Sequence, residues 1–428
     1  MQTKARSPLA VLVLLVVAMA ASPALVALAA AAAAQQQQLV PCMYIFGDSL
    51  VDSGNNNNIL SLARANYQPY GIDFTGAAPP GRFTNGLTVV DMLADMLGLR
   101  PPLIPAYAMA QPGDFARGLN FASGAAGIRP ETGNNLGRHY PFSEQVEHFR
   151  AAVRQMGPNA GSPERLGRCI FYVGMGSNDY LNNYFMPNYY TTAQSYDPAA
   201  YAADLLQEYS RQLAALHALG ARKFVLAAVG DIGCIPYELA RIDNNQDDDD
   251  AAPSSDSGTG ISISLGGVGL TVGGGGGGGG STRAANASRS GGNGGGACNE
   301  EINSAIAIYN RGLLSMVKRL NGGGGGGRMA GATVVYLDTV RTGRSVAASA
   351  AAHGFEVLDR GCCGVGRNNG QITCLPMQQP CGDRSKYVFW DAFHPTEAAN
   401  RIYAARAFNS SAAAGDAYPI NVSQLAAI

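Results

Sequence analysis

Charged side chains are scarce in this sequence. Aspartate, glutamate, lysine and arginine make up 14% of the 428 residues, whereas about a quarter is usual for a soluble domain. The 30 basic and 31 acidic side chains nearly cancel, so no strongly basic surface is available for nucleic acid or for an anionic membrane. We therefore expect no nucleic-acid partner.

Long apolar runs are missing everywhere except at the start of the chain. Residues 9–28 are almost continuously apolar behind Lys4 and Arg6, and a run of alanines then extends to Ala34. A basic start, an apolar stretch and small residues at its end are typical of a secretory signal peptide, which we place at residues 1–34. The alternative is a membrane anchor, because the run approaches the length that spans a bilayer. The small residues at its end favour cleavage, and we expect a secreted protein with no stable membrane span.

Cysteine is also infrequent, with eight in the chain. An even number suits disulfides in an oxidising compartment, although composition does not settle which cysteines pair. Cys362 and Cys363 are adjacent and unsuited to each other, and Cys374 and Cys381 lie close behind as their natural partners. The alternative is a metal site at these four, but they lack the paired C-x-x-C spacing of zinc ligands. We therefore expect no metal.

Five short apolar runs have the character of buried strands, and stretches with helical spacing lie between them. Strands that alternate with helices predict an α/β fold in which a mostly parallel sheet is covered on both faces. The predicted strands are residues 43–47, 119–122, 169–174, 224–229 and 333–337, and the predicted helices include residues 88–97, 143–155, 198–219 and 299–320.

One long segment, residues 243–297, differs in composition from the rest of the chain. It holds an acidic run followed by serine and glycine, and such a composition cannot bury enough apolar surface to become ordered. We predict a disordered insertion within a single domain that spans residues 35–428. A strand pair over residues 261–272 is the alternative for its middle part. Cys234 and Cys298 bracket the segment and are able to close its base.

Histidine is rare enough to narrow the choice of a general base. Of the five histidines, only His394 has an acidic residue, Asp391, three positions before it. A carboxylate at this spacing can reach the imidazole Nδ1–H across one tight turn, which leaves Nε2 free to take a proton. The alternative for an isolated Asp-x-x-His is an aspartate that caps a helix beside an ordinary surface histidine.

Ser49 directly follows the first predicted strand, at a point where we expect a helix to begin. Ligands of parallel sheets bind at the carboxyl ends of the strands, and a serine there needs a base and donors for a developing oxyanion. Gly124 and Asn178 follow the second and third strands and carry a backbone N–H and a side-chain amide. Taken one at a time, the alternatives are a helix cap for Ser49 and turn residues for the other two.

Five motifs together resemble the GDSL esterase/lipase family, in its SGNH-hydrolase fold and its secreted plant-type branch. They appear in the order of the family and extend over nearly the whole chain after the signal peptide. The acidic and glycine-rich tract between Cys234 and Cys298 is longer than the connection that the family usually has there. The motifs are residues 46–56 (FGDSLVDSGNN), 80–86 (PGRFTNG), 120–127 (NFASGAAG), 173–181 (VGMGSNDYL) and 387–396 (YVFWDAFHPT).

The resemblance implies a role for each candidate site residue. Ser49 matches the nucleophile of the family, His394 the general base and Asp391 the acid that orients it. The oxyanion donors match the Ser49 backbone N–H, the Gly124 backbone N–H and the Asn178 side chain. The resemblance also implies that no cofactor and no metal take part.

The same resemblance implies a flavodoxin-like, three-layer α/β/α sandwich whose five parallel strands have the order 2-1-3-4-5. Cys42 lies just before the first strand and Cys169 starts the third, so both would lie at one edge of neighbouring strands, and we expect a disulfide between them. An extracellular location, in the cell wall or apoplast, is implied as well. Three asparagines are glycosylation acceptors if they are exposed, namely Asn286, Asn409 and Asn421.

The activity that the resemblance implies is hydrolysis of a carboxylic ester, of a lipid or of another small or polymer-borne acyl ester, through an acyl-Ser49 intermediate. An acyltransferase with the same three residues and a polysaccharide O-acetylesterase are the alternatives. A secreted protein that binds glycans or lipids without catalysis is a further one. The motifs do not encode the natural substrate, its chain length or the oligomeric state.

Overall fold

The computed structural model of the protein describes residues 38–75, 80–99, 102–247, 262–265, 268–271, 298–322 and 329–428. The predicted signal peptide, residues 1–34, and the acceptor Asn286 lie outside these residues. The chain divides into a first unit, Met1–Leu39, and a second unit, Val40–Ile428, to which the description below refers. Within the described ranges, no helix combines the length and the apolar character that a membrane crossing requires.

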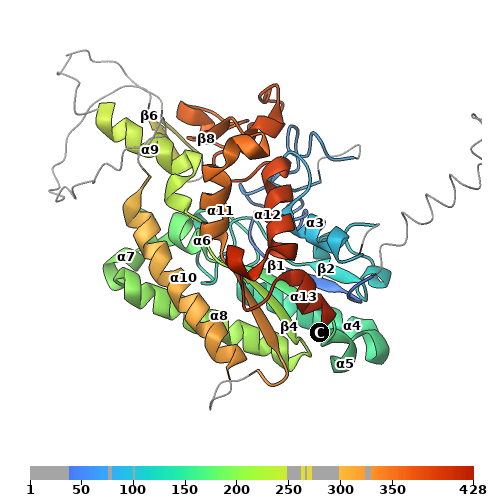
Figure 1. The fold of residues 1–428 in the computed structure, drawn as a ribbon. Coiled ribbons are helices and arrows are strands. Elements are labelled where there is room, and N and C mark those ends of the chain that lie inside the picture. Colours follow the sequence, from blue (N-terminus) through green and yellow to red (C-terminus); the bar gives the residue numbers. More distant parts are fainter. Residues whose placement is uncertain are drawn as a thin grey trace, which may run out of the picture. The chain divides into compact units, whose positions relative to one another are not determined.

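The second unit is built on a six-stranded sheet with the order β10-β7-β4-β3-β1-β2 (Figure 1). Neighbouring strands are parallel except β10, which pairs antiparallel with β7 at the edge. The parallel strands confirm the order 2-1-3-4-5, and β10 is an edge strand that the sequence did not predict. The strands are β1 (Met43–Gly47), β2 (Gly118–Asn120), β3 (Ile170–Gly174), β4 (Lys223–Ala227), β7 (Thr333–Leu337) and β10 (Ala417–Tyr418).

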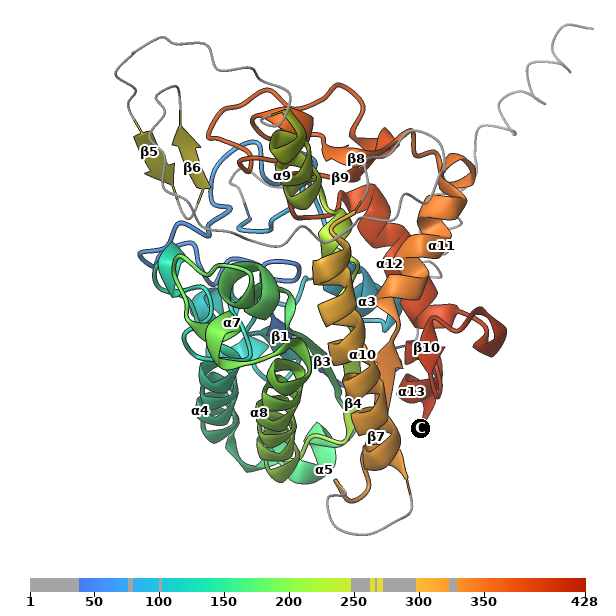
Figure 2. The same cartoon turned by 90° about the vertical axis from the view of Figure 1, so that its left-hand side faces the viewer.

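Both faces of the sheet are buried. Successive side chains of a strand point to opposite sides, and each set packs into its own apolar cluster. In β1, Tyr44 and Phe46 belong to one apolar cluster, whereas Met43 and Ile45 belong to another. Figure 2 shows α4 and α8 on one side of the strands and α12 and α13 on the other. The first cluster is completed by α4 (Phe142–Ala160), α8 (Pro198–Ala218) and α10 (Glu300–Asn321), and the second by α3 (Val89–Met96), α12 (Glu397–Asn409) and α13 (Val422–Ala427).

Smaller elements complete the unit. A two-stranded parallel sheet of β8 and β9 precedes the segment that carries His394, and α11 follows β7 at the carboxyl end of the main sheet. These elements are β8 (Val357–Gly361), β9 (Tyr387–Phe389), α11 (Thr339–Ala348), α5 (Pro163–Leu166), α6 (Ser177–Asp179), α7 (Thr192–Ser195) and α9 (Pro236–Asp247).

The prediction of disorder over residues 243–297 is wrong at two places. Helix α9 continues into the segment as far as Asp247, and β5 (Ser262–Leu265) pairs antiparallel with β6 (Val268–Thr271). The alternative of a strand pair is therefore the one that the structure has. Apolar residues at every second position within each short run favour this pairing over disorder. The remainder of the segment lies outside the described residues.

Four disulfides link all eight cysteines. Cys42–Cys169 joins the starts of β1 and β3, as the resemblance implied. Cys234–Cys298 brackets the long insertion. The neighbouring residues Cys362 and Cys363 each bond to one of the two expected partners, in the disulfides Cys362–Cys381 and Cys363–Cys374.

Candidate active site

The end of β1 is held in place before the chain reaches Ser49. The Gln145 side-chain amide accepts a hydrogen bond from Gly47 N–H at 3.0 Å and donates one to Gly47 O at 2.8 Å. A Cβ on Gly47 would lie 2.5 Å from the Val51 side chain, so a larger residue does not fit where the chain folds back. The serine that follows is therefore presented from a fixed strand end.

Ser49 itself lies in a tight turn, and the helix expected to begin there is absent from the described chain. The Asp48 carboxylate accepts a hydrogen bond from Leu50 N–H at 3.0 Å, and the Asp48 carbonyl accepts one from Asp52 N–H at 3.0 Å. The turn leaves the Ser49 N–H without a hydrogen-bond acceptor in the part of the chain that the structure describes. A free N–H next to the hydroxyl is what an oxyanion would need.

The structure brings Ser49, His394 and Asp391 into one hydrogen-bonded chain. Ser49 Oγ lies 2.8 Å from His394 Nε2, and His394 Nδ1 lies 2.8 Å and 2.9 Å from the two oxygens of Asp391. A carboxylate only accepts hydrogen bonds, so Nδ1 carries the proton and Nε2 accepts the hydrogen of the serine. The resemblance had placed Ser49 together with Asp391 and His394, which lie more than 300 positions further along the chain.

Asp391 is ionised in this arrangement. Its burial alone would raise the pKa of the carboxyl, but the charge of His394 and the hydrogen bonds donated by His394, Tyr70 and Phe393 outweigh burial and hold the pKa below its usual value. The carboxylate is fully buried, so its negative charge acts on the imidazole with little screening by water. It therefore favours the protonated imidazole that forms when His394 takes a proton.

The segment from Trp390 to His394 forms a tight turn, and this turn brings the Asp391 carboxylate to the imidazole three positions later. Trp390 N–H donates to His394 O at 2.7 Å, and Asp391 Oδ1 accepts from Phe393 N–H at 2.9 Å and from His394 N–H at 2.8 Å. Cys363 N–H donates to Trp390 O at 2.7 Å from the neighbouring disulfide-bonded loop. The turn is thus held from inside by Asp391 and from outside by the loop of Cys363.

Two residues that sequence reasoning did not assign to the site contact this turn. Tyr70 donates a hydrogen bond to Asp391 Oδ2 at 2.6 Å, and burial raises the pKa of the Tyr70 hydroxyl well above its ordinary value, so it remains a donor. The Phe83 ring lies 5.1 Å from the His394 ring. Phe83 belongs to the motif at residues 80–86, which could have pointed to a place near the site. No motif includes Tyr70, so the sequence did not predict its contact with Asp391.

Two hydrogen bonds hold the Asn178 side chain in place. Its Nδ2 donates to Ala126 O at 2.9 Å and its Oδ1 accepts from Asn182 Nδ2 at 2.7 Å. A carbonyl oxygen only accepts, so the contact with Ala126 fixes which end of the amide is nitrogen. The second N–H of Asn178 has no acceptor among the described residues.

Gly124 does not fit the expectation of a free donor. Its N–H donates to Asp52 Oδ2 at 3.0 Å, and Asp52 Oδ1 accepts from the N–H groups of Gly54 and Asn55, each at 2.8 Å. A buried carboxylate gathers such donors because it has lost its water, and burial raises the pKa of Asp52 to about 6. The glycine is needed for space, since a Cβ there would lie 2.8 Å from the Phe83 ring.

A metal site is not formed in the described part of the chain. No group of three or more histidine, cysteine, aspartate or glutamate residues is arranged there to hold a metal ion. The four cysteines that had a metal site as their alternative are all in disulfides. The chemistry that the described side chains offer is that of a serine activated by an imidazole and a carboxylate, which is suited to acyl transfer.

Comparison with known proteins agrees with this geometry. The family model described as GDSL-like Lipase/Acylhydrolase matches residues 43–407. GDSL esterase/lipase At1g33811 of Arabidopsis thaliana is 49% identical over 392 residues, covering 90% of this chain and 91% of that protein. GDSL esterase/lipase At1g29670 of the same plant is 44% identical over 391 residues, covering 90% and 92%. The chain therefore belongs to the GDSL lipase/acylhydrolase family.

Proposed function

We propose that Ser49 is the nucleophile of this protein, with His394 as its general base and Asp391 as the residue that orients and charges His394. Membership of the GDSL family makes the chain a serine hydrolase of carboxylic esters, with small-molecule or polymer-borne esters as substrates. The observation that carries the assignment is the unbroken hydrogen-bonded path from Ser49 Oγ through the imidazole to Asp391.

Hydrolysis proceeds in two acyl-transfer steps on this path. Ser49 Oγ attacks the acyl carbon while its proton passes to His394 Nε2. The bond to the alcohol then breaks, and His394 gives the proton to the departing oxygen. Water attacks the acyl-Ser49 ester with His394 again as base. The bond to Ser49 breaks, the serine regains its proton from His394, and the carboxylic acid leaves.

The negative charge on the tetrahedral intermediates needs donors that already point at it. The Ser49 N–H and the second N–H of Asn178 have no acceptor in the described structure, which supports both as oxyanion donors. The Gly124 N–H becomes a third donor only when Asp52 releases it. We therefore propose that the Ser49 N–H and the Asn178 side chain provide most of the stabilisation of this negative charge.

Replacement of the nucleophile tests the proposal. Purified Ser49→Ala protein should lose turnover of p-nitrophenyl butyrate and should not react with a fluorophosphonate probe that labels the wild-type protein on a single peptide. Ser53→Ala is the control, because Ser53 is a serine of the same loop that is buried, whereas Ser49 is half-buried, and the Ser53 hydroxyl has no partner in the described structure. Labelling or turnover that persists in Ser49→Ala at the wild-type level would refute the assignment.

An acyltransferase with the same residues is not favoured over a hydrolase by any observation. The same acyl-Ser49 ester would pass to a sugar or lipid hydroxyl, so product analysis with glycerol or glucose present in excess separates the two reactions. A polysaccharide O-acetylesterase is the variant in which the acyl group is acetate, and a protein that binds without catalysis would not react with the fluorophosphonate. The serine, imidazole and carboxylate in hydrogen-bond contact argue against the last of these.

We also infer that the protein is secreted into the cell wall or apoplast. The apolar start of the chain supports this location, and so do the four disulfides, which persist in oxidising compartments. Expression through a secretory pathway tests it: the medium should contain protein that begins near residue 35. A glycan is expected on the exposed Asn409, whereas Asn421 should stay unmodified, because it is buried and caps α13 with its side chain.

A further inference from the structure

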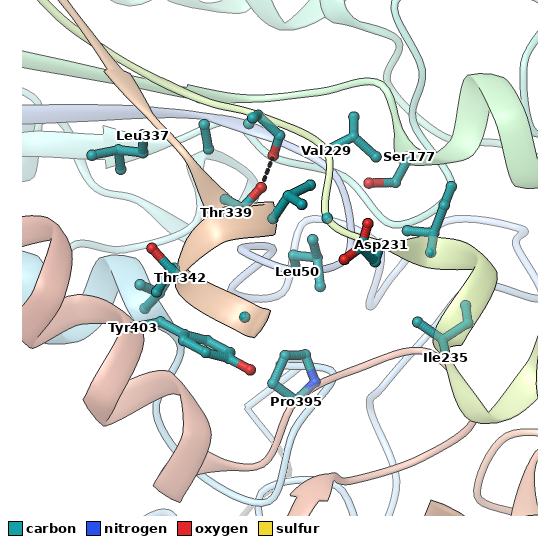
Figure 3. A pocket seen from close by; sticks show the side chains of 18 of the residues that line it. Leu50, Ser177, Val229, Asp231, Ile235, Leu337, Thr339, Thr342, Pro395 and Tyr403 are labelled. Carbon is teal, nitrogen blue, oxygen red and sulfur yellow. Dashed lines mark hydrogen bonds between the residues drawn. The ribbon is translucent and has the colours of Figure 1, made fainter. Parts of the chain in front are cut away.

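A cavity of about 470 Å³ lies at the carboxyl ends of β1, β3, β4 and β7 (Figure 3). Its size falls within the range of roughly 300–1,000 Å³ that is usual for small-molecule sites. Figure 3 shows side chains from several separate segments around the cavity, among them Leu50, Ile235 and Tyr403. Nothing in the mechanism above uses this space.

The cavity borders each of the three segments that carry catalytic groups. Asp48 and Leu50, on either side of Ser49, line it, and so do Phe393 and Pro395, on either side of His394. Ser177, which precedes Asn178, lines it as well. A group that is attached to the carbon attacked by Ser49 therefore has this cavity as an adjacent compartment.

The walls of the cavity are mainly apolar, and the two threonines among the lining residues already have partners. Thr339 donates its hydroxyl hydrogen to Ala228 O at 2.9 Å, and this bond is drawn in Figure 3. Thr342 donates to the Asp416 carboxylate at 3.0 Å. Most of the remaining lining is provided by aliphatic and aromatic side chains, which include Val51, Val229, Ile232, Ile235, Leu337 and Phe389.

The charges at the cavity do not suit an anion. Arg344 and Asp231 both line it, and they form a two-point ion pair with distances of 2.6 Å and 2.9 Å. Asp48 adds a carboxylate to the wall, and no unpaired cation faces it from the described lining residues. A free carboxylate or phosphate head group is thus disfavoured, whereas an uncharged hydrocarbon chain is suited to the space.

We propose that this cavity holds the acyl chain of the ester that Ser49 attacks, and that the enzyme prefers esters of medium-length and longer unbranched acyl chains to acetyl esters. The inference rests on the proposed function and narrows its substrate class. It places the protein with the esterases of lipid-like acyl groups and apart from those that remove acetate from polysaccharides. Each methylene that enters the cavity should raise kcat/KM about fourfold, equivalent to about 0.8 kcal/mol, until the space is full.

Filling the cavity from α11 tests the inference. Gly343 lines the cavity, and a Cβ built on it meets no heavy atom within 4 Å. Gly343→Leu therefore places an apolar side chain in open space, and leucine is also a better helix former than glycine. Ala348→Leu is the matched control, because Ala348 lies on the same helix, is exposed and does not line the cavity. Ala347→Phe is a second filling variant, at an exposed α11 position that does line it.

The readout is kcat/KM for p-nitrophenyl acetate, butyrate, octanoate and laurate with each protein. The wild-type enzyme and Ala348→Leu should show the same rise with chain length. Gly343→Leu and Ala347→Phe should lower the ratio of octanoate to acetate by about tenfold or more, the usual size of such steric discrimination. Turnover of the acetate ester should stay near the wild-type value.

Two outcomes with the filling variants, and one with the wild-type enzyme, would overturn the inference while the proposed function stands. One is an unchanged chain-length profile in both filling variants. The other is an equal loss for all four esters in variants whose thermal unfolding is unchanged. A wild-type enzyme that shows no rise beyond acetate would overturn it as well. Failure of the proposed function looks different, because Ser49→Ala would then hydrolyse all four esters as the wild-type protein does.

Discussion

The hydroxyl of Tyr70 donates a hydrogen bond of 2.6 Å to Asp391 Oδ2, the same carboxylate that holds His394. The two residues are 321 positions apart, and both are buried. The hydrogen bond draws negative charge toward the tyrosine and fixes the plane of the carboxylate. We therefore expect Tyr70 to act on the reaction through Asp391, as a positioning residue.

Tyr70→Phe should weaken catalysis without abolishing it. The loss of a hydrogen bond to a charged group is expected to lower kcat by about tenfold, or roughly 1.4 kcal/mol, with KM little changed. Tyr70 helps to hold the pKa of the Asp391 carboxyl below its usual value, so without this hydrogen bond that pKa should rise and the acid limb of the pH profile should move to higher pH. Kinetics with p-nitrophenyl butyrate over a range of pH measure both effects.

The control for this change is Tyr67→Phe. Tyr67 is a neighbouring tyrosine whose hydroxyl donates to Cys374 O at 2.9 Å and makes no hydrogen bond to Asp391. The Tyr67→Phe substitution should leave the acid limb of the pH profile at its wild-type position. If Tyr70→Phe shifted neither kcat nor the acid limb, the hydroxyl would have only a packing role.

Asp48 should affect the pH profile through its own carboxyl. Burial raises the pKa of the Asp48 carboxyl to about 6, although hydrogen bonding to Leu50 N–H and the charge of His394 lower it somewhat. Above this pH the ionised Asp48 adds negative charge next to Ser49, where the oxyanion forms. Asp48→Asn removes that charge and keeps an oxygen for the Leu50 N–H, so kcat should gain most above pH 6. Asp359→Asn, at a partly exposed ion pair, should give no such gain.

The stability that the protein gains from Asp48→Asn should depend on pH as well. The pKa in the folded protein, about 6, is raised from the ordinary value of 3.8. The folded state therefore binds this proton more tightly than the unfolded state, and its contribution to stability is lost as pH rises through about 6. Asn should raise the thermal midpoint near neutral pH and leave it unchanged near pH 4. Equal gains at both pH values would contradict the assignment of the raised pKa to Asp48.

The central sheet was predictable because its strands are short apolar runs that end at glycine or a polar residue. The runs at residues 43–47 and 333–337 match β1 and β7 at both ends. Helix α12 was not predicted, because its buried residues include Ala399, Ala404 and Ala407, and alanines leave no bulky apolar stripe to read. The fold class could be predicted from a few strongly apolar segments. A helix whose buried residues are small could not, because its position depends on packing with the rest of the chain.

The contact of Ser49, His394 and Asp391 was predictable, because the Asp-x-x-His spacing and the family motifs mark these residues in the sequence. The contact of Tyr70 with Asp391 was not, since it joins a proline-flanked loop to a turn at the other end of the chain. The involvement of Gly124 N–H with Asp52 was also hidden, because a motif states which residue is present and not which acceptor its N–H meets. Both depend on long-range packing of loops.

Asn178→Ala should separate transition-state stabilisation from substrate binding. Loss of one oxyanion donor typically costs about a hundredfold to a thousandfold in kcat, and KM should change little. Asn182→Ala is the graded control: its amide only orients Asn178 through Oδ1, so the loss should be much smaller. Reaction with the fluorophosphonate should be slowed in the first variant, and kcat near the wild-type value there would remove Asn178 from the oxyanion site.

Two disulfides should differ in what they contribute. Cys42–Cys169 spans 127 positions and lies at the start of β1 and β3, away from the catalytic turn. Cys363–Cys374 spans 11 positions, and Cys363 N–H holds Trp390 O at the edge of that turn. The entropy lost by the unfolded chain grows with the closed loop, from roughly 3 kcal/mol for the short one to about 5 kcal/mol for the long one.

Replacing each pair of cysteines by serine should therefore have different effects, mainly on stability for one disulfide and mainly on kcat for the other. The Cys42→Ser, Cys169→Ser protein should unfold at markedly lower denaturant concentration while its kcat, measured well below the unfolding transition, stays close to that of the wild type. The Cys363→Ser, Cys374→Ser protein should lose less stability but more kcat, since the turn that aligns Asp391 with His394 loses its outer support. A loss of kcat that simply followed the loss of stability in both proteins would mean that the short disulfide stabilises the fold without positioning the catalytic turn.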